Sequence, residues 1–402
     1  MAVMAAAPGA GLEDLGHGAA TTTRRFVATA VAVGAIVGSS VLLPALPANL
    51  APVDPLLLGA ILLGLASTSS GVHSPPKAAL RTMAPWLALL AATTVLALTT
   101  AGITSWALLS IAKSGYAIAL FLGVYALFWS HPVDRRALVW ATGLAIVVVT
   151  GGLLATWEPP DRAAGTFYHP NYPGHFLAMA LIVWWCNGRH LGRIRTVIAL
   201  VGVGGIVLTA SFGAIMMLLV AAGPNVLAWS RRHLWVAAAG ASILLIAAIS
   251  LDGTAPGNSD EELAVTDTLS ADRFQRSQEG RIDLWTTALD ATIDHPQGLG
   301  PMGFRNTPEL SGKDAADDGR LAHNLYISYL VDRGPLGLIA LLGLGLALWR
   351  HAPRGGTARL LLLAIAASNL VRETSHYRHM WIFLAVALTL DHAASRRSRS
   401  AP

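Results

Sequence analysis

The chain has 402 residues, of which 54% are hydrophobic and 13% are charged, and its formal net charge is +5. Because an average soluble domain carries about 25% charged residues, this composition excludes an ordinary soluble protein and predicts an all-α bundle of transmembrane helices. The positive charge does not indicate nucleic-acid binding, since the arginines and lysines fall at the boundaries of apolar segments, as they do in membrane proteins.

Residues 1–25 are small and polar, and we expect them to form a disordered cytoplasmic tail. The first apolar run follows Arg24 and Arg25, which we interpret as a topological anchor rather than as part of an export signal. A bilayer crossing needs roughly 20 apolar residues, and about twelve segments meet this criterion, nine within residues 26–251 and three within residues 334–392. Their expected limits are 26–43, 52–67, 83–100, 104–129, 138–156, 172–187, 195–212, 214–229, 234–251, 334–349, 358–371 and 377–392.

The loops between these segments alternate in charge. Every second loop carries basic residues, beginning with Lys77 and Arg81, and residues 393–402 form a basic tail. By the positive-inside rule, these loops and both termini lie in the cytoplasm. The same topology places the one long hydrophilic loop, residues 252–333, on the outer face of the cytoplasmic (inner) membrane.

The long outer loop begins with an acidic stretch, residues 252–274, which fits a mobile cover over a site and a solvated linker equally well. After Gly280, apolar residues recur at spacings of three and four. This spacing predicts an amphipathic helix along the outer membrane interface, with Arg281 at its start. The apolar face of the expected helix consists of Ile282, Trp285, Leu289 and Ile293.

Two further elements complete the outer loop. Glycines and prolines in residues 295–303 predict a turn whose backbone approaches another element or a ligand closely. From His323 the chain becomes helical again, with His323, Ile327 and Leu330 on one face. We expect a half-helix above the tenth transmembrane segment, with His323 in its first turn and pointing into the bundle, and with residues 332–335 interrupting it.

Four short motifs in this region occur together and in a fixed order: Gly-Arg-x-x-x-Trp at 280–285, His-Pro-x-Gly-x-Gly-x-x-x-Phe at 295–304, His-Asn-x-Tyr at 323–326 and Gly-Pro-Leu-Gly at 334–337. In these motifs the sequence resembles the O-antigen ligase/polymerase family of membrane glycosyltransferases. The earlier Pro170-Asn171 pair also resembles an element of that family, and the resemblance extends over roughly residues 100 to 390.

The resemblance implies a metal-independent and cofactor-independent transfer of a glycan. The donor is then a glycan linked to a polyprenyl diphosphate, and the acceptor is a glycan, lipid or protein on the outer face of the membrane. By the same resemblance, His323 acts on the acceptor hydroxyl and Arg281 holds the diphosphate. Asn324 and Tyr326 complete the His-Asn-x-Tyr motif and are candidate substrate-binding residues.

One departure from the family pattern affects phosphate binding. Members often carry an arginine beside a serine at the outer end of the segment that corresponds to 195–212, whereas here Ser211 is followed by Phe212. The sequence therefore lacks one expected phosphate ligand. Arg372 and Arg378, both expected near the outer surface, are candidate replacements.

Each candidate also has a structural interpretation. Arg281 could only orient its interfacial helix, and His323 could cap a helix or be hydrogen-bonded in the core. His169 and Asn171 lie where they could bind sugar hydroxyls, but they also fit a proline-broken turn whose polar groups satisfy the backbone. Lys113 lies within the fourth segment, where a charge is a candidate for function, here for phosphate binding, or simply extends toward the interface.

Three functions remain open. A ligase and a repeat-unit polymerase of the same family share a scaffold, and a transporter or lipid flippase with about twelve helices belongs to a different class. Transporters usually consist of two related halves, whereas the long outer loop makes the halves of this chain unlike, which favours the enzyme. The sequence contains no zinc motif or phosphate-cradling glycine loop, and the single cysteine, Cys186, excludes an internal disulfide.

Overall fold

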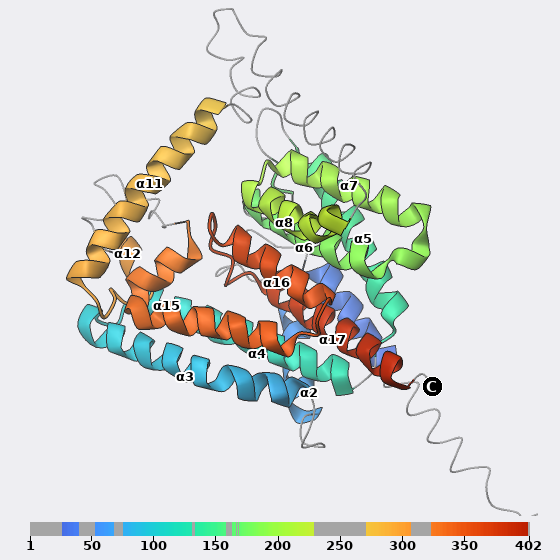
Figure 1. Ribbon diagram of the computed structural model, residues 1–402, viewed down its shortest axis with the longest axis horizontal. Coiled ribbons are helices and arrows are strands. Elements are labelled where there is room, and N and C mark those ends of the chain that lie inside the picture. The colour runs from blue at the N-terminus through green and yellow to red at the C-terminus, as the bar shows by residue number, and fades with distance from the viewer. Residues whose placement is uncertain are drawn as a thin grey trace, which may run out of the picture.

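The computed structural model describes residues 26–39, 53–67, 75–130, 133–157, 163–165, 167, 169–228, 271–306 and 323–400. Within these ranges all regular structure is helical (Figure 1). An unlabelled first helix covers Phe26–Gly38. The others are α2 (Asp54–Ser67), α3 (Pro75–Ala101), α4 (Ser105–Ser130), α5 (Arg135–Ala155), α6 (Asn171–Asn187), η3 (Arg189–Leu191), α7 (Arg193–Thr209), α8 (Phe212–Ala228), α11 (Ala271–Asp294), α12 (Gly303–Asn306), α15 (Leu325–His351), α16 (Thr357–Ser368) and α17 (Arg378–Ser400).

The apolar segments of the sequence coincide with these helices. Each predicted transmembrane segment that falls in the described residues overlaps one helix, whereas the ninth, 234–251, lies outside them, as do residues 1–25 and most of the acidic stretch. Four described helices, α3, α4, α5 and α15, are long and apolar enough to cross a membrane. The fold class is therefore a membrane-type helix bundle.

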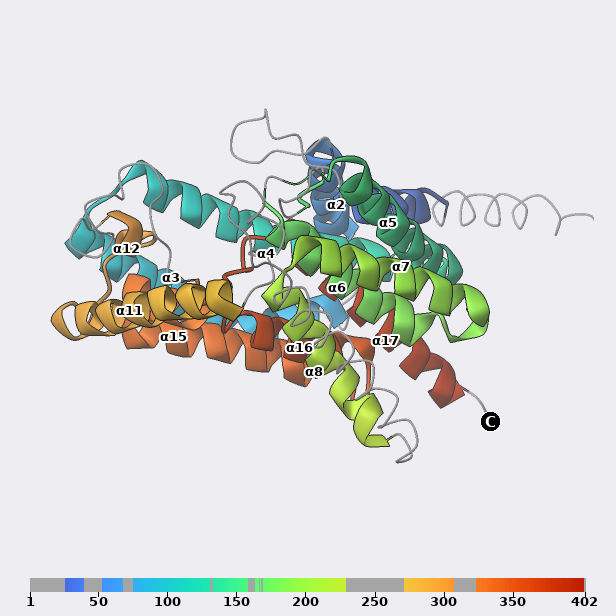
Figure 2. The same cartoon turned by 90° about the horizontal axis from the view of Figure 1, so that it is seen from above.

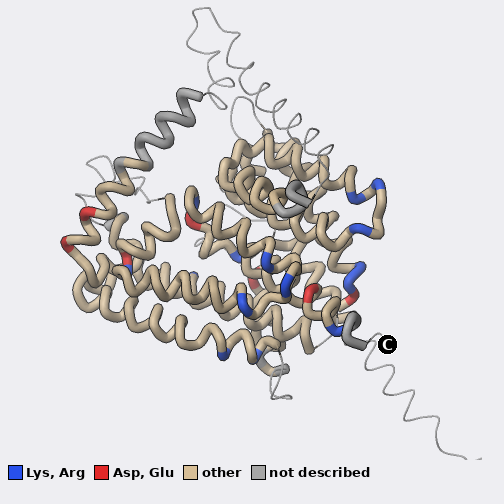
Figure 3. Tube along the Cα trace, viewed as in Figure 1, with Lys and Arg blue, Asp and Glu red and all other residues tan. Residues whose placement is uncertain are grey.

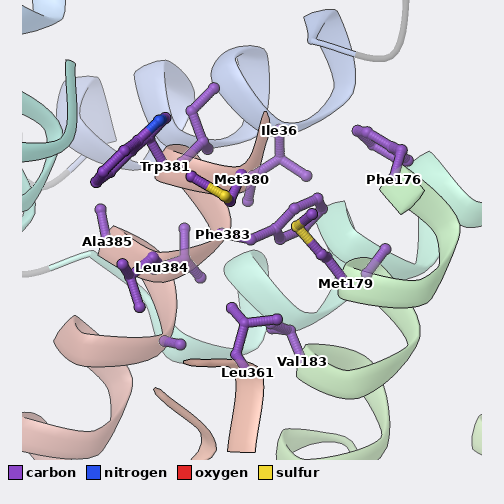
Figure 4. Close-up of a cluster of buried hydrophobic side chains, with 14 of the residues drawn as sticks. Ile36, Phe176, Met179, Val183, Leu361, Met380, Trp381, Phe383, Leu384 and Ala385 are labelled. Carbon is purple, nitrogen blue, oxygen red and sulfur yellow. The ribbon is translucent and has the colours of Figure 1, made fainter. Parts of the chain in front are cut away.

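Helix α17 forms the centre of the bundle. Its residues 381–390 are all buried, because α4, α6 and α16 pack around them. Figure 4 shows Phe383 and Met380 of α17 among Phe176 and Met179 of α6 and Leu361 of α16. The basis of this packing is the continuous apolar run of the last predicted segment, which has no polar face to expose.

Helix α15 lies against α3 in the antiparallel direction. Trp86 of α3 contacts Gly343 of α15, where any Cβ would overlap the indole ring, and Thr94 of α3 bonds Arg333 of α15. Because residue numbers rise along one helix and fall along the other, the end of α3 and the start of α15 lie at the same end of the bundle. Gly343 therefore allows α3 and α15 to approach closely.

We call this end of the bundle the site end, because it also contains the end of α16 and the starts of α6 and α17. At the opposite, basic end, guanidinium groups stack on indole rings in three pairs. These pairs are Arg195 with Trp185, Arg359 with Trp349 and Arg396 with Trp129. Most lysines and arginines in Figure 3 accordingly lie away from α11. The basic loops that the sequence predicted on one side of the membrane thus gather at one end of the molecule.

The long outer loop differs from its prediction in where the amphipathic helix begins. Helix α11 starts at Ala271, ten residues before Arg281, so Arg281 lies in its middle rather than at its start. The reason is that Gly280 costs a helix only about 1 kcal/mol, and the preceding residues 272–279 include arginine, glutamine and glutamate, which favour helices.

Of the predicted apolar face of α11, Trp285 is half-buried and the other three residues do not pack on the protein. Ile282, Leu289 and Ile293 are exposed, Ile293 by 78%, whereas Ala288 and Ala291 are buried. Helix α11 lies beside α15 in both views (Figures 1 and 2). An apolar stripe that faces away from the bundle is consistent with a helix that lies along a membrane interface.

Candidate functional site

His323 precedes α15 instead of lying in its first turn, which corrects the sequence prediction. Asn324 is the N-cap: its side-chain Oδ1 accepts hydrogen bonds from the backbone N–H groups of Tyr326 (2.9 Å) and Ile327 (3.2 Å). Asparagine is among the best capping residues, so it fixes the helix start one residue after the histidine. His323 is half-buried and has a left-handed backbone, with φ of 49°, a conformation that is uncommon for a residue other than glycine.

The His-Asn-x-Tyr motif is attached to the end of α16. The backbone N–H of Leu325 donates to Asn369 O (3.0 Å), and the Tyr326 hydroxyl donates to Ala366 O (2.9 Å). Asn324 and Tyr326, which the sequence suggested as substrate ligands, therefore have bonding partners within the protein. His323 lies two residues from the junction with Asn369, where the α16–α17 loop begins.

The α16–α17 loop, residues 369–377, carries charged groups that are partly covered. Arg372 donates through Nε to the hydroxyl of Tyr377 (3.2 Å), and Ser375 donates to Glu373 Oε1 (3.4 Å). Burial raises the pKa of the Glu373 carboxyl, and the positive charges of Arg333 and Arg372 oppose this shift. Arg378, just after the loop, forms an ion pair with Asp54 at the start of α2.

The start of α6 packs against the same loop. Tyr172 stacks on Tyr377, with ring centroids 4.3 Å apart, and its hydroxyl is 3.4 Å from His376 Nε2. His169 contacts the edge of Tyr172, with ring centroids 6.5 Å apart, and its Nδ1 accepts from the backbone N–H of Asn171 (3.1 Å). The structure thus brings His169 and Asn171 to the loop that carries Arg372.

Lys113 of α4 faces this loop as well. Burial, together with the nearby positive charges of Lys113 and Arg372, lowers the pKa of His376 to about 3. The imidazole of His376 is therefore neutral at physiological pH. Two of the cations that the sequence suggested for phosphate binding, Lys113 and Arg372, converge on one histidine.

Arg333 is a buried cation that the sequence reasoning did not select. It is 5% exposed, donates through Nε to Thr94 Oγ1 (3.1 Å), and its guanidinium carbon lies 4.5 Å from the ring centroid of Tyr329. Nη1 of Arg333 lies 3.9 Å from Oδ2 of Asp332. In the sequence, the adjacent Asp332-Arg333 pair at the edge of an apolar segment could have identified Arg333, since charges there are costly and usually have a role. We interpreted this pair in the sequence only as an interruption of the helix.

The turn after α11 packs against a kink in α15 and is hydrogen-bonded to it. Gly334 has φ of 68° and ψ of −178° inside α15, and a Cβ there would overlap Pro296 O. The backbone N–H of Leu299 donates to Val331 O (2.9 Å), and that of Met302 donates to Asp332 Oδ2 (2.9 Å). This confirms the close backbone approach that the glycines predicted. It also fixes α11 relative to the half-helix that follows His323.

The position of Arg281 is known only as part of α11, because its side chain lies outside the described residues. Helix α11 contacts α15 through a small apolar cluster that includes Ala288, Phe304 and Val331. The helix that carries Arg281 and the half-helix that follows His323 are therefore neighbours. The side-chain role of Arg281 stays a prediction.

Phe212 opens α8, where the family pattern would carry an arginine. The preceding Ser211 is fully buried, and its hydroxyl has no hydrogen-bond partner among the described residues. The next residue, Gly213, lies against His175 Nε2 and the Ser368 hydroxyl, which are 2.7 Å apart. The start of α8 therefore meets α6 and the end of α16 at Ser368.

An apolar groove of about 460 Å³ runs beside α15. Residues of α15 and α16, many of them leucines, form most of its wall, and it also touches α3, α4 and α17. Its polar groups are few and include Tyr326, Tyr329 and Ser375. Since Tyr326 belongs to the His-Asn-x-Tyr motif and Ser375 to the α16–α17 loop, one end of the groove lies at the candidate site.

Comparison with known proteins agrees with this arrangement. Residues 197–342 match the family model described as O-antigen ligase. The matched region runs from α7 into α15, and it includes Phe212, Arg281 and His323. No curated protein matches the chain. The chain is a helical membrane-type protein, and the region from 197 to 342 carries the match to the O-antigen ligase family model.

Proposed function

We propose that the protein transfers a glycan from a polyprenyl-diphosphate carrier to an acceptor hydroxyl on the outer face of the cytoplasmic membrane. The observation that carries this proposal is the junction between Leu325 and Asn369. It joins the segment of His323 to the loop of Arg372, beside the polar end of the apolar groove. A lipid-diphosphate substrate needs these features together: a proton acceptor, cations and an apolar channel.

The chemistry follows from the groups at the site. The acceptor oxygen forms a bond to the anomeric carbon of the donor sugar while the bond from that carbon to the phosphate oxygen breaks. His323 takes the proton of the acceptor hydroxyl, a role suited to a group that titrates near neutrality. The polyprenyl diphosphate leaves as an anion, and Arg281, Arg372 and Lys113 stabilise the charge that develops on it.

The apolar groove supports a lipid-linked donor. A groove lined by leucines and few polar groups accommodates the hydrocarbon chain of an isoprenoid, whereas the polar groups of a soluble nucleotide-sugar would lose hydrogen bonds to water there. Tyr326 and Ser375 then lie where the chain meets its diphosphate. A repeat-unit polymerase would use the same donor and the same groups.

The test is transfer by purified protein in lipid nanodiscs supplied with a lipid-linked glycan. We expect His323→Ala to lower turnover by roughly 10²–10⁴-fold, as is typical for removal of a general base, with donor binding retained. Arg281→Ala and Arg372→Ala should weaken donor binding, and Arg372→Lys should restore part of it. His190→Ala, at an exposed position in η3, is the matched control. Full transfer by His323→Ala would refute the assignment.

Deletion of the gene separates the remaining functions. Loss of glycan attachment with polymerised, lipid-linked glycan retained indicates a ligase, and single unpolymerised repeats indicate a polymerase. If the protein moves labelled lipid across the membrane of proteoliposomes without transferring glycan, it is a flippase and not a transferase.

A further inference from the structure

We propose that a second cavity, between the α3–α4 turn and the turn that follows α11, binds a neutral saccharide unit of the glycan. This inference rests on the proposed function, which it extends from the reacting bond to the sugar chain. The cavity has a volume of about 340 Å³, near the lower end of the range of ~300–1,000 Å³ for small-molecule sites. We call it the turn cavity, and its lining includes Thr100, Thr104, Ala107, His295, Gln297 and Gly300.

The composition of the turn cavity indicates the class of ligand. Among the described residues, the lining contains hydroxyl, amide and imidazole side chains but no lysine, arginine, aspartate or glutamate. These residues offer a diphosphate no fixed cation, whereas sugar hydroxyls both donate and accept hydrogen bonds with them. Thr100 donates to Ala97 O (2.9 Å) and Thr104 accepts from the N–H of Ala107 (3.1 Å), so both hydroxyl oxygens occupy defined positions.

The opposite wall of the turn cavity is glycine-rich and firmly held. Gly298 and Gly300 have φ of 91° and 82°, a region that side chains rarely adopt. Gly298 packs against the backbone of Asp332, and a Cβ at Gly300 would lie 3.1 Å from the Cβ of Ala101, so the glycine lets the two walls meet at this point. The contacts with α3 and α15 thus hold the glycine-rich wall in place.

The location of the turn cavity suits a sugar that is removed from the reacting bond. The cavity lies at the site end, because α3 ends there beside the kink of α15. The half-helix 325–333 separates this kink from His323, and nine helical residues span about 14 Å at 1.5 Å each. A chain of a few sugars covers that distance, so the cavity selects the glycan without taking part in the transfer.

The direct test measures binding of a sugar that lacks both lipid and phosphate. The probe is the oligosaccharide released from the surface glycan of the source cell, and its binding to full-length protein in nanodiscs is followed by saturation-transfer NMR. Gln297→Ala removes one hydrogen-bonding side chain, and we expect it to weaken binding by about 2- to 10-fold. Ala101→Trp fills the cavity from an exposed position at the end of α3 and should abolish binding.

Ala155→Trp, at an exposed position at the end of α5, is the matched control and should bind like the wild type. Inorganic pyrophosphate should not compete. Binding that is unchanged in both Gln297→Ala and Ala101→Trp, or that pyrophosphate displaces, would overturn the proposal. In Ala101→Trp, a higher KM for the lipid-linked donor assigns the cavity to the donor glycan, and a higher KM for the acceptor assigns it to the acceptor.

The same experiment separates this inference from the function on which it rests. His323→Ala should bind the oligosaccharide with unchanged affinity, because the turn cavity contains no part of the His-Asn-x-Tyr motif. Full transfer by His323→Ala would refute the proposed catalytic role and leave oligosaccharide binding intact. Loss of transfer in His323→Ala together with unchanged oligosaccharide binding in the cavity variants would refute only the saccharide site.

Discussion

Gly334 connects the two halves of the candidate site, and its replacement by alanine tests that connection. Its φ of 68° and ψ of −178° lie in a region that is essentially restricted to glycine, and adopting it costs other residues roughly 1–3 kcal/mol. A Cβ would also overlap Pro296 O, and overpacking of this kind costs a further 1–3 kcal/mol or so. We therefore expect Gly334→Ala to destabilise the protein by roughly 2–6 kcal/mol, or to push the turn off the kink.

The assay combines unfolding in nanodiscs with transfer activity. If the turn leaves the kink, the bonds from Leu299 to Val331 and from Met302 to Asp332 are lost, and α11 moves relative to the half-helix after His323. Activity should then fall more than the folded fraction does. The matched control is Gly204→Ala in α7, outside the apolar groove, where a Cβ meets no atom within 4 Å and helix propensity rises by up to ~1 kcal/mol. Equal stability and activity of the two variants would refute the reasoning.

Three further predictions concern the elements around His323. Asn324→Ala should cost about 0.5–2 kcal/mol of unfolding free energy through loss of the cap, and Asn324→Ser should recover most of it in the same unfolding assay. Arg333→Met should cost roughly 1.5–3 kcal/mol, the usual value of a hydrogen bond to a charged group, while Arg333→Lys should cost less if the charge itself matters. The Glu373 carboxyl has a raised pKa and therefore binds its proton more tightly in the folded protein than in the unfolded chain. Its contribution to stability is present below its ordinary pKa of 4.5 and is lost as the pH rises through the folded pKa. In unfolding measurements at a series of pH values, Glu373→Gln should remove this contribution to the fall in unfolding free energy with rising pH.

The sequence predicted the helices well because an apolar run long enough to cross a bilayer leaves the chain few alternatives. The turn at 295–303 was also predictable, since its glycines and prolines prevent the helix from continuing. The ends of the helices were harder to predict from the sequence. Helix α11 continues back through Gly280 to Ala271, because a single glycine weakens a helix without ending it. The helix was predicted to begin at His323, whereas α15 begins after its N-cap, Asn324, because Asn324 was considered as a substrate ligand and not as a cap.

The contacts of Arg333 and Arg372 could not be predicted in the same way. The partner of Arg333, Thr94, is 239 positions away in the sequence, and no local pattern pairs α3 with α15. Tyr172 of α6 and Tyr377 of the α16–α17 loop stack although they lie far apart in the sequence. Only the general rule that charges within or beside membrane segments have partners or functions pointed to these residues.

The departure at Phe212 makes Arg372 the strongest candidate for the missing phosphate ligand. Position 212 begins α8, and the neighbouring Gly213 lies against the Ser368 hydroxyl. The backbone N–H of Arg372 donates to Ser368 O (3.0 Å), so Arg372 and the start of α8 meet at the same residue of α16. Arg378, the other candidate, is engaged by Asp54. The loop that carries the Arg372 guanidinium therefore adjoins the region where the family places its arginine, and Phe212 does not by itself argue against phosphate binding at this site.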